Sequence, residues 1–265
     1  MKDEGIAICH VDDFEDEHLI QGFNKVKSFY KKFTADSNVK ERMLKYQRGE
    51  FLSTGNGKPF EINSFHYLNR DLDFGDGIVE FFLSDVILKI ATNYLGVYPK
   101  SYVFNSWIHL PHKQKRVKSM NWHRDPEDTK IFKIYLAVGD ISIQNGPFQY
   151  VKHSIVGDKY ADLQEYRITN RYPKKGFIEE NVDKNDIVSM IGKSGTLAFV
   201  DNYGFHRGGY VESGHRLLAQ GVFLKPDIIK KAPSHIQRMS MNLYHENYKK
   251  LSPMAKYAIN KEFFR

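Results

Sequence analysis

Hydrophobic residues in the first third of the chain recur at helical spacing. From Asp12 to Phe33, apolar side chains return every three or four positions, at Phe14, Leu19, Phe23, Val26, Tyr30 and Phe33. Acidic residues crowd the start of this stretch and lysines its end, as the helix dipole favours. A second stretch, Ile78 to Leu95, has similar spacing, and Gly96 follows it where a helix C-cap belongs. The pattern predicts two amphipathic helices.

The period of the pattern changes after Pro99. Short runs rich in β-branched and aromatic residues follow, separated by Gly, Pro or Asn, at Tyr102–His109, Ile131–Val138, Thr196–Asp201 and Arg216–Phe223. Helices first and strands afterwards are typical of an α+β fold with a jelly-roll, cupin-like core. We therefore expect a single domain over residues 1–265, with its jelly-roll core at about 98–224 and the N-terminal and C-terminal helices packed outside.

Three further segments complete the expected architecture. Gly49 to Asp76 is rich in Gly, Asn and Ser and is expected to form long loops that shape a pocket mouth. Tyr160 to Thr169 is expected to be a helical insertion among the strands. Ser234 to Arg265 has helical character with a break at Pro253.

Composition narrows the kinds of site that the chain can hold. Apolar residues make up 41% of the sequence, enough for a sizeable core, and Cys9 is the only cysteine. A single cysteine excludes an intramolecular disulfide and cysteine-rich zinc or iron–sulfur sites, and it favours a reducing compartment. The chain begins without a secretion signal and has no apolar run of the roughly 18 residues that a membrane span needs. These features predict a cytoplasmic protein with no membrane partner, whose metal ligands would be histidines and carboxylates.

The net charge of +7 and the pI of about 9.1 allow two interpretations. One is a polyanionic partner such as nucleic acid, and the other is a basic surface with an anionic small-molecule substrate. Aromatic residues do not interleave the basic run Lys113–Lys118 as they do in nucleic-acid modules, which argues against nucleic acid. That run is either a solvated loop or a pocket entrance that attracts a phosphorylated, carboxylated or CoA-linked substrate. The sequence carries no signal for a particular oligomeric state.

Candidate metal ligands stand at His123, Asp125 and His206. His123 and Asp125 form a His-x-Asp pair, and residues i and i+2 of an extended segment point to the same side. If the jelly roll folds His206 next to them, two histidines and one carboxylate occupy one face of a metal and leave three positions open. His215 is the rival to His206, with Lys225 ten residues later, but it stands in a Ser-Gly-His turn.

Arg216 follows His206 by ten residues and opens a predicted strand. A guanidinium inside a barrel is expensive to bury alone, but it matches a carboxylate with two parallel, charge-assisted hydrogen bonds. The distal carboxylate of 2-oxoglutarate would supply that partner.

This ordered set and its flanking text carry a resemblance to a known family. With "WHRDPEDTKIFKIYLAV", "NGP" and "GTLAFVDNYGFHRGG", the segment from Tyr98 to Leu224 resembles the phytanoyl-CoA dioxygenase-like family of Fe(II)/2-oxoglutarate oxygenases. The resemblance implies a double-stranded β-helix in which His123, Asp125 and His206 hold Fe(II) and Arg216 anchors 2-oxoglutarate. It also implies O2 as a reactant, hydroxylation of a C–H bond in a small organic substrate, and release of succinate and CO2.

Further residues are expected to line the same pocket. Lys133 and Tyr135 share one side of the strand after the first ligands, and Asn105 and Trp107 lie on an earlier strand. Each is a candidate contact for the cosubstrate. Trp122 precedes the first ligand and either forms a wall of the site in contact with the cosubstrate or packs as a core aromatic.

Two other functions are compatible with the sequence, and a kinase is not. The same chemistry would suit a protein or nucleic-acid substrate, and a catalytically silent jelly-roll binding module would keep the fold alone. His123-Arg124-Asp125 also spells the kinase catalytic triplet, but Lys130 stands where a kinase needs asparagine. The triplet Asp73-Phe74-Gly75 precedes the His-Arg-Asp motif instead of following it, so the order excludes a kinase.

Overall fold

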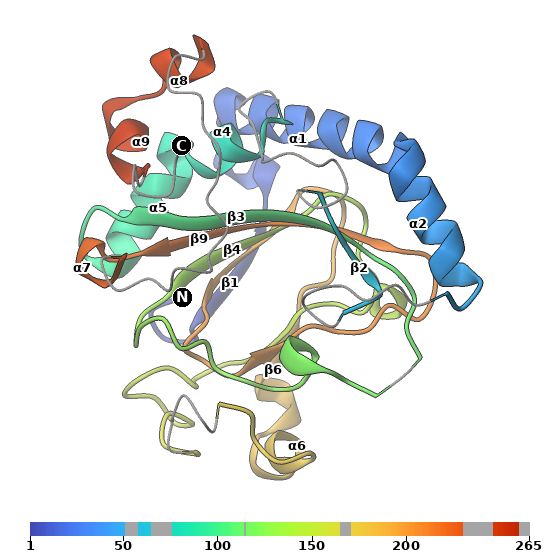
Figure 1. Ribbon diagram of the computed structural model, residues 1–265. Coiled ribbons are helices and arrows are strands. Elements are labelled where there is room, and N and C mark those ends of the chain that lie inside the picture. The colour runs from blue at the N-terminus through green and yellow to red at the C-terminus, as the bar shows by residue number, and fades with distance from the viewer. Residues whose placement is uncertain (51–57, 65–75, 114, 165–170, 230–245, 260–265) are drawn as a thin grey trace.

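Two antiparallel sheets form the centre of the structure, a computed structural model that describes residues 1–50, 58–64, 76–113, 115–164, 171–229 and 246–259. The large sheet has the strand order β1-β7-β4-β9-β3-β2, and the small sheet has the order β6-β5-β8. The strands of the large sheet are β1 (Ile6–His10), β2 (Glu61–Asn63), β3 (Lys100–His109), β4 (Phe132–Ala137), β7 (Thr196–Asp201) and β9 (Arg216–Leu224). Those of the small sheet are β5 (Gln149–Val151), β6 (Ile187–Ser189) and β8 (His206–Arg207). The small sheet lies beneath the large one in Figure 1, as in a jelly roll.

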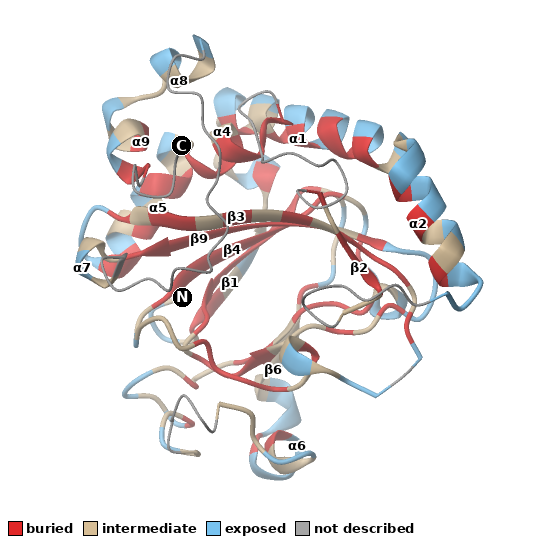
Figure 2. Cartoon of the chain, in the orientation of Figure 1, coloured by how far each residue is buried: buried red, intermediate tan, exposed pale blue. Residues whose placement is uncertain are grey.

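Helices cover the outer face of the large sheet. They are α1 (Glu17–Ala35), α2 (Ser37–Gln47), α4 (Ile78–Phe82), α5 (Asp85–Leu95) and α9 (Pro253–Ala258), with the short α7 (Pro226–Ile229) and α8 (Glu246–Lys250) nearby. Figure 2 shows their buried sides turned toward the sheet. α6 (Phe177–Asn181) lies on the opposite side, next to the small sheet. No helix in the described ranges is both long and apolar enough to cross a membrane.

Because side chains alternate along a strand, the large sheet has one face that packs against the helices and one face that points toward the small sheet. Apolar residues of the large sheet pack with the helices in one core cluster, among them Phe104, Ile134, Phe199 and Phe223. Gly221 lets α4 approach this face, since a Cβ atom there would lie 2.7 Å from Cδ1 of Phe82. The alternate positions of the same strands point between the two sheets. Because the helices cover only one face, the other holds a second, smaller apolar cluster together with the polar residues that line the cavity.

The predicted strands and the C-cap are confirmed, whereas one predicted helix is interrupted and the other begins later than predicted. Gly96 ends α5 with φ of 78°, in the left-handed region that favours glycine. The predicted helix Ile78–Leu95 is interrupted at Leu83, and Ser84 stands at the N-cap of α5. The first helix begins only at Glu17, because the side chain of Asp16 accepts a hydrogen bond from the backbone N–H of Leu19.

Other segments depart from the sequence pattern. Strand β1 and helix α2 were not predicted; β1 adds to the edge of the sheet by pairing with β7. Tyr160 to Gln164 forms turns instead of a helix, and residues 165–169 lie outside the described residues. Of the predicted C-terminal stretch, residues 234–245 and 260–265 also lie outside; Pro253 begins α9, which packs against α5 and β3. The expected loop region contains β2, and its segments 51–57 and 65–75 are not described.

Candidate metal centre

Backbone pairing brings two distant segments together. The backbone N–H of His123 donates to the carbonyl of His206 at 3.0 Å, and the N–H of His206 donates back at 3.0 Å. Nearby, the N–H of Asp125 donates to the carbonyl of Asn202 at 3.0 Å. The fold thus places His206 beside the His-x-Asp pair.

The three side chains converge in a buried cluster. One potential ligand atom from each of His123, Asp125 and His206 lies within 4.8 Å of the others. Nε2 of His123 is 3.6 Å from Oδ1 of Asp125, and Nε2 of His206 is 3.6 Å from Oδ2. Two imidazoles and one carboxylate, gathered on one side of a small space, match the donor set that non-haem iron(II) enzymes use.

Hydrogen bonds orient both imidazoles for metal binding. Nδ1 of His123 lies 2.9 Å from the carbonyl oxygen of Asn121, and Nδ1 of His206 lies 2.9 Å from that of Gly204. A carbonyl only accepts, so Nδ1 carries the proton and Nε2 keeps its lone pair. Burial lowers the pKa of both histidines, with His206 adding to the effect on His123, whose pKa falls to about 3. Both rings are therefore neutral at physiological pH, as metal ligands must be.

Asp125 also contacts two donors that are not candidate ligands. Its Oδ2 accepts hydrogen bonds from the ammonium of Lys133 and, at 3.0 Å, from Nδ2 of Asn202. Burial is the largest single effect and raises the pKa of Asp125, but the charge and hydrogen bond of Lys133 and the two imidazoles together lower it by more, and the net pKa lies below its usual value. Lys133, predicted to contact the cosubstrate, thus has its ammonium on the ligand carboxylate while its side chain still lines the cavity.

The cluster forms part of the wall of a cavity of about 160 Å³. Apolar side chains from both sheets and the loop before His123 line the cavity, namely Trp107, Met120, Phe148 and Leu218. Polar lining residues include Lys58, Glu61, His109, Ser119, Tyr135, Arg216 and Gln220. The cavity can hold a small organic molecule next to a metal.

Arg216 lines this same cavity and is only 3% exposed. Its Nη1 donates to the carbonyl of Gly209 at 3.2 Å, and its Nε has no partner among the described residues. No carboxylate in the described part of the chain forms an ion pair with it. Burial lowers the pKa of Arg216 to about 10, which still leaves it charged. A buried cation of this kind calls for an anionic ligand.

A row of charged residues beside Arg216 was missed by sequence reasoning. Glu61, His109 and Arg216 are direct neighbours across β2, β3 and β9. Oε2 of Glu61 lies 3.3 Å from both Nζ of Lys58 and Nε2 of His109. Burial raises the pKa of Glu61, but Lys58 and His109 bring it down to about 2. Side-chain alternation along β3 could have revealed His109, because it lies two positions after Trp107 and faces the same side.

Two predicted cosubstrate contacts lie away from the cavity lining. The indole of Trp122 donates to Oε1 of Glu179 at 2.9 Å, and the guanidinium of Arg207 lies 4.2 Å from its ring centroid. Trp122 belongs to the cluster beneath the small sheet, which matches its alternative interpretation as a core aromatic. Asn105 lies near Asn63, with 3.5 Å between the amide nitrogen of Asn63 and its Oδ1, and is not among the lining residues.

Arg124 stands between two candidate ligands and points away from them. It is 1% exposed, and its guanidinium donates to four backbone carbonyls, those of Ser154, Tyr160, Ala161 and Tyr203, at 2.8–3.2 Å. It also lies 3.9 Å from the ring centroid of Phe205. Arg124 therefore joins the His-x-Asp segment, the turn that leads to His206 and the segment after β5.

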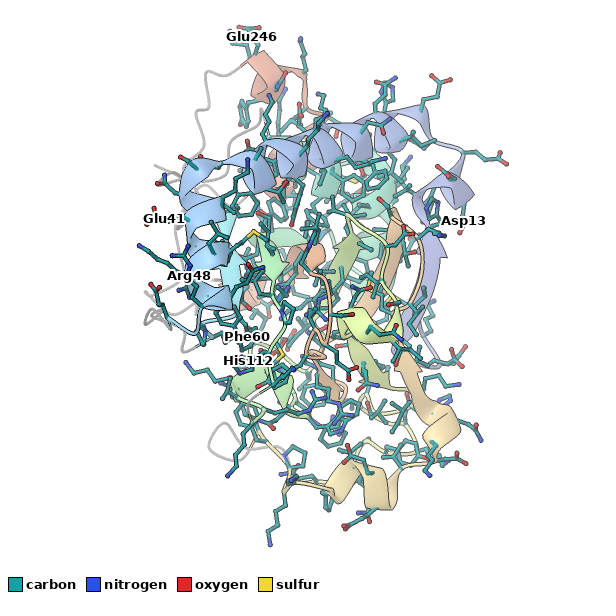
Figure 3. All side chains as sticks on the ribbon, turned by 90° about the vertical axis from the view of Figure 1, so that its right-hand side faces the viewer. Asp13, Glu41, Arg48, Phe60, His112 and Glu246 are labelled. Carbon is teal, nitrogen blue, oxygen red and sulfur yellow. The ribbon has the colours of Figure 1, made fainter. Side chains whose placement is uncertain are left out.

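Replacing Arg124 with leucine is expected to lower the free energy of unfolding by at least about 2 kcal/mol. Each hydrogen bond to a charged group contributes roughly 1.5–3 kcal/mol, and the change leaves four carbonyls without their donor. Urea denaturation of the metal-free protein measures the effect. The control is Arg48→Leu, since Arg48 is exposed beyond the end of α2 (Figure 3) and should matter by less than about 0.5 kcal/mol. Equal losses in the two variants would contradict this account of Arg124.

Comparison with known proteins identifies the fold. No family model matches the sequence, and no curated protein matches it. The epimerase SnoN, solved with Fe3+, α-ketoglutarate (2-oxoglutarate) and nogalamycin RO, matches with a TM-score of 0.54 and 12% identity over 92% of this chain and 93% of that one. The α-ketoglutarate-dependent carbocyclase SnoK has a TM-score of 0.52 and 15% identity over 84% and 80%. AviO1 from Streptomyces viridochromogenes Tue57 has a TM-score of 0.51 and 12% identity over 84% of this chain and 90% of that one. These similarities confirm the predicted jelly-roll architecture.

Proposed function

We propose that this chain is a single-domain non-haem iron(II) oxygenase that uses 2-oxoglutarate and O2 to hydroxylate a C–H bond of a small organic substrate. The observation that carries the proposal is the convergence of His123, Asp125 and His206 in one cavity with a buried Arg216 that pairs with no described carboxylate. Two proteins share the fold: SnoN, solved in complex with Fe3+ and α-ketoglutarate, and SnoK, described as an α-ketoglutarate-dependent carbocyclase. The motifs from Tyr98 to Leu224 favour the phytanoyl-CoA dioxygenase-like branch.

Each residue has a defined part in this function. The two Nε2 atoms and one carboxylate oxygen would hold Fe(II) and leave coordination positions for small ligands. Arg216 would bind the distal carboxylate of 2-oxoglutarate with charge-assisted hydrogen bonds. Trp107, Phe148 and Leu218 form apolar parts of the cavity lining and would limit the access of water. With 2-oxoglutarate and O2, the bound iron supplies the oxidising chemistry, while the chain supplies orientation and shelter.

Anaerobic addition of 2-oxoglutarate to the iron(II)-loaded protein tests this function. We expect a weak visible charge-transfer band, because chelation of iron by the keto and carboxylate oxygens produces one, and uncoupled or substrate-driven formation of succinate once O2 is admitted. Oxaloacetate and succinate serve as control ligands under the same conditions. Folded protein that binds iron but gives neither a band nor succinate would exclude the proposed function.

The surroundings of the cavity mouth favour an anionic substrate. Ser119 and Met120 line the cavity, and Lys113, Lys115 and Lys118 are exposed on the loop just before them. Among the described residues, no carboxylate forms an ion pair with these three lysines. Their positive charge would raise the local concentration of an anion. A phosphorylated, carboxylated or CoA-linked small molecule fits such an entrance.

The loop is fixed at both ends, which keeps the lysines beside the mouth. At its start, the ring of His112 lies 4.5 Å from that of Phe60, and its Nδ1 is 2.6 Å from the hydroxyl of Tyr46. Figure 3 shows Phe60 and His112 together below α2. Near its end, Arg116 donates to the carbonyls of Met120 and Gly208 at 3.0 and 3.1 Å.

Changing Lys113, Lys115 and Lys118 together to glutamine should raise the KM for an anionic substrate about tenfold at low salt, with little change in kcat. The reason is the loss of long-range attraction, which salt screens over about 10 Å at 0.1 M. Steady-state kinetics at two ionic strengths, with a substrate found by a succinate-release screen, measures the effect. The matched control replaces three exposed lysines of α1 and α2, at Lys31, Lys32 and Lys40. Identical KM values and salt sensitivity in both triple variants would contradict the role of the loop.

A cytoplasmic location is consistent with this chemistry. Fe(II) and a free thiol both persist in a reducing compartment. Cys9 is partly buried, and burial raises the pKa of its thiol to about 11, which keeps it protonated. Action on a protein or nucleic acid has no observation in its favour beyond net charge, and the intact ligand set argues against a silent binding module.

A further inference from the structure

The two oxygens of the Asp125 carboxylate have different surroundings. Oδ2 accepts hydrogen bonds from the ammonium of Lys133 and the amide of Asn202. Oδ1 lies 3.6 Å from Nε2 of His123 and has no hydrogen-bond donor among the described residues. Lys133, Asp125 and Asn202 are all buried, so water does not screen these contacts. Oδ2 lies 3.6 Å from Nε2 of His206 and is already held by two protein donors, whereas Oδ1 faces the imidazole of His123 without a donor.

Asn202 is held in place by its own backbone. Its N–H donates to the carbonyl of Ile131 and its carbonyl accepts from the N–H of Asp125, both at 3.0 Å. Its Nδ2 also lies 3.0 Å from the hydroxyl of Tyr135 and 2.9 Å from Nε2 of His206. A completely buried amide thus contacts two of the three candidate ligands without being one of them.

We propose that Lys133 and Asn202 are positioning residues that reserve Oδ2 of Asp125, so that the metal is bound through Oδ1 alone, and that Lys133 also tunes the centre toward a dianionic ligand. This inference rests on the proposed function. It extends that function by naming two side chains outside the ligand set: both would orient the Asp125 carboxylate, and Lys133 would also favour an anionic ligand.

The charges around the site explain why Lys133 would favour a dianionic ligand. Asp125 contributes −1 and Lys133 +1, and the two histidines are neutral, so this set has no net charge. A divalent metal then gives +2 at the ligand set, and Arg216 adds the positive charge that would meet the distal carboxylate of 2-oxoglutarate. Without Lys133 the loaded centre would be only +1, because the charge of Asp125 would no longer be compensated. In a buried site such a difference strongly affects ligand affinity.

Opposite effects on cation and anion binding distinguish this role from a merely structural one. Loss of the Lys133 charge makes the empty site more negative, which favours the metal, and makes the loaded site less positive, which disfavours 2-oxoglutarate. Loss of Asn202 changes no charge and releases Asp125, so only metal binding should weaken. A general loosening of the fold would instead weaken both ligands together.

The test uses cobalt(II) as a redox-stable replacement for iron(II), with calorimetric titration of cobalt and then of 2-oxoglutarate into the cobalt-saturated protein. For Lys133→Met we expect the ratio of the 2-oxoglutarate Kd to the cobalt Kd to rise at least tenfold, and for Lys133→Arg, which keeps the charge, to stay within about threefold. For Asn202→Ala we expect cobalt to bind about 10–100-fold more weakly, a typical effect of losing a group that orients a ligand. 2-Oxoglutarate binding to the saturated Asn202 variant should change less than threefold.

Controls separate these effects from misfolding. Lys152→Met removes a lysine that pairs with Glu4 outside the cavity, at 3.3 Å, and should change neither affinity. Thermal unfolding of each cobalt-saturated variant checks the fold. The inference is overturned if Lys133→Met changes both affinities by the same factor, or if Asn202→Ala binds cobalt as wild type does. Wild-type protein that binds cobalt but not 2-oxoglutarate would instead refute the proposed function, and the Asn202 comparison would still test the positioning role.

Discussion

Replacing His206 with alanine is expected to abolish high-affinity metal binding, whereas replacing His215 leaves it unchanged. His206 is buried within 4.8 Å of the ligand atoms of His123 and Asp125, and its Nδ1 bond to Gly204 directs Nε2 toward them. His215 is exposed in the turn before β9. Without one imidazole, two ligands remain, too few to hold a divalent metal against water. All succinate formation should be lost with the metal.

The measurement is cobalt(II) titration followed in the visible spectrum, with metal-dependent thermal stabilisation as a second readout. Wild type and His215→Ala should show the same spectrum and the same increase in Tm, and His206→Ala neither. The metal-free melting temperature of each variant verifies that the fold is retained. Metal binding that survives in His206→Ala and is lost in His215→Ala would reverse the ligand assignment.

Replacing Arg216 with leucine should weaken 2-oxoglutarate binding by roughly 30-fold to several thousand-fold and leave metal affinity nearly unchanged. Truncating one partner of a buried, hydrogen-bonded charge pair costs about 2–5 kcal/mol, and each 1.4 kcal/mol is a factor of ten. Arg216→Lys should recover only part of the loss, because an ammonium cannot make two parallel hydrogen bonds to one carboxylate. Titration of cobalt and then of 2-oxoglutarate into each variant measures the two affinities.

A second ligand tests which end of the cosubstrate Arg216 contacts. 2-Oxobutyrate keeps the keto acid group but lacks the distal carboxylate. Wild type should bind 2-oxoglutarate far more tightly than 2-oxobutyrate, and Arg216→Leu should lose that discrimination. If both proteins distinguish the two acids equally, the distal carboxylate is bound elsewhere, and the row of Lys58, Glu61 and His109 becomes the next region to examine.

The fold explains how so small a set of residues can be held in place. Helices α1, α4 and α5 cover the outer face of the large sheet, and Gly221 allows the close contact with α4. The inner face is therefore free to present Lys133, Tyr135 and Arg216 from adjacent strands. Side chains on regular strands are positioned more accurately than side chains on loops.

The sequence by itself determined which segments become strands and which residues offer ligand chemistry. Short runs of β-branched and aromatic residues bounded by Gly, Pro or Asn predicted β3, β4, β7 and β9, because such side chains pack well on a pleated sheet. His123 and Asp125 were found by a second local rule, since i and i+2 of an extended segment point to one side. The helical period could not show that Ser84 begins a new helix, because a local break preserves the apolar face.

Only the tertiary structure decided which distant groups meet. The pairing of His123 with His206, the contact of Lys133 and Asn202 with Asp125, and the burial of Arg124 against four carbonyls all depend on how the two sheets are placed. Edge strand β1 likewise exists because β7 offers free hydrogen-bonding groups to it. Local spacing sets the direction of a side chain along its own segment, whereas its partner is set by packing and long-range hydrogen bonding that no short stretch of sequence encodes.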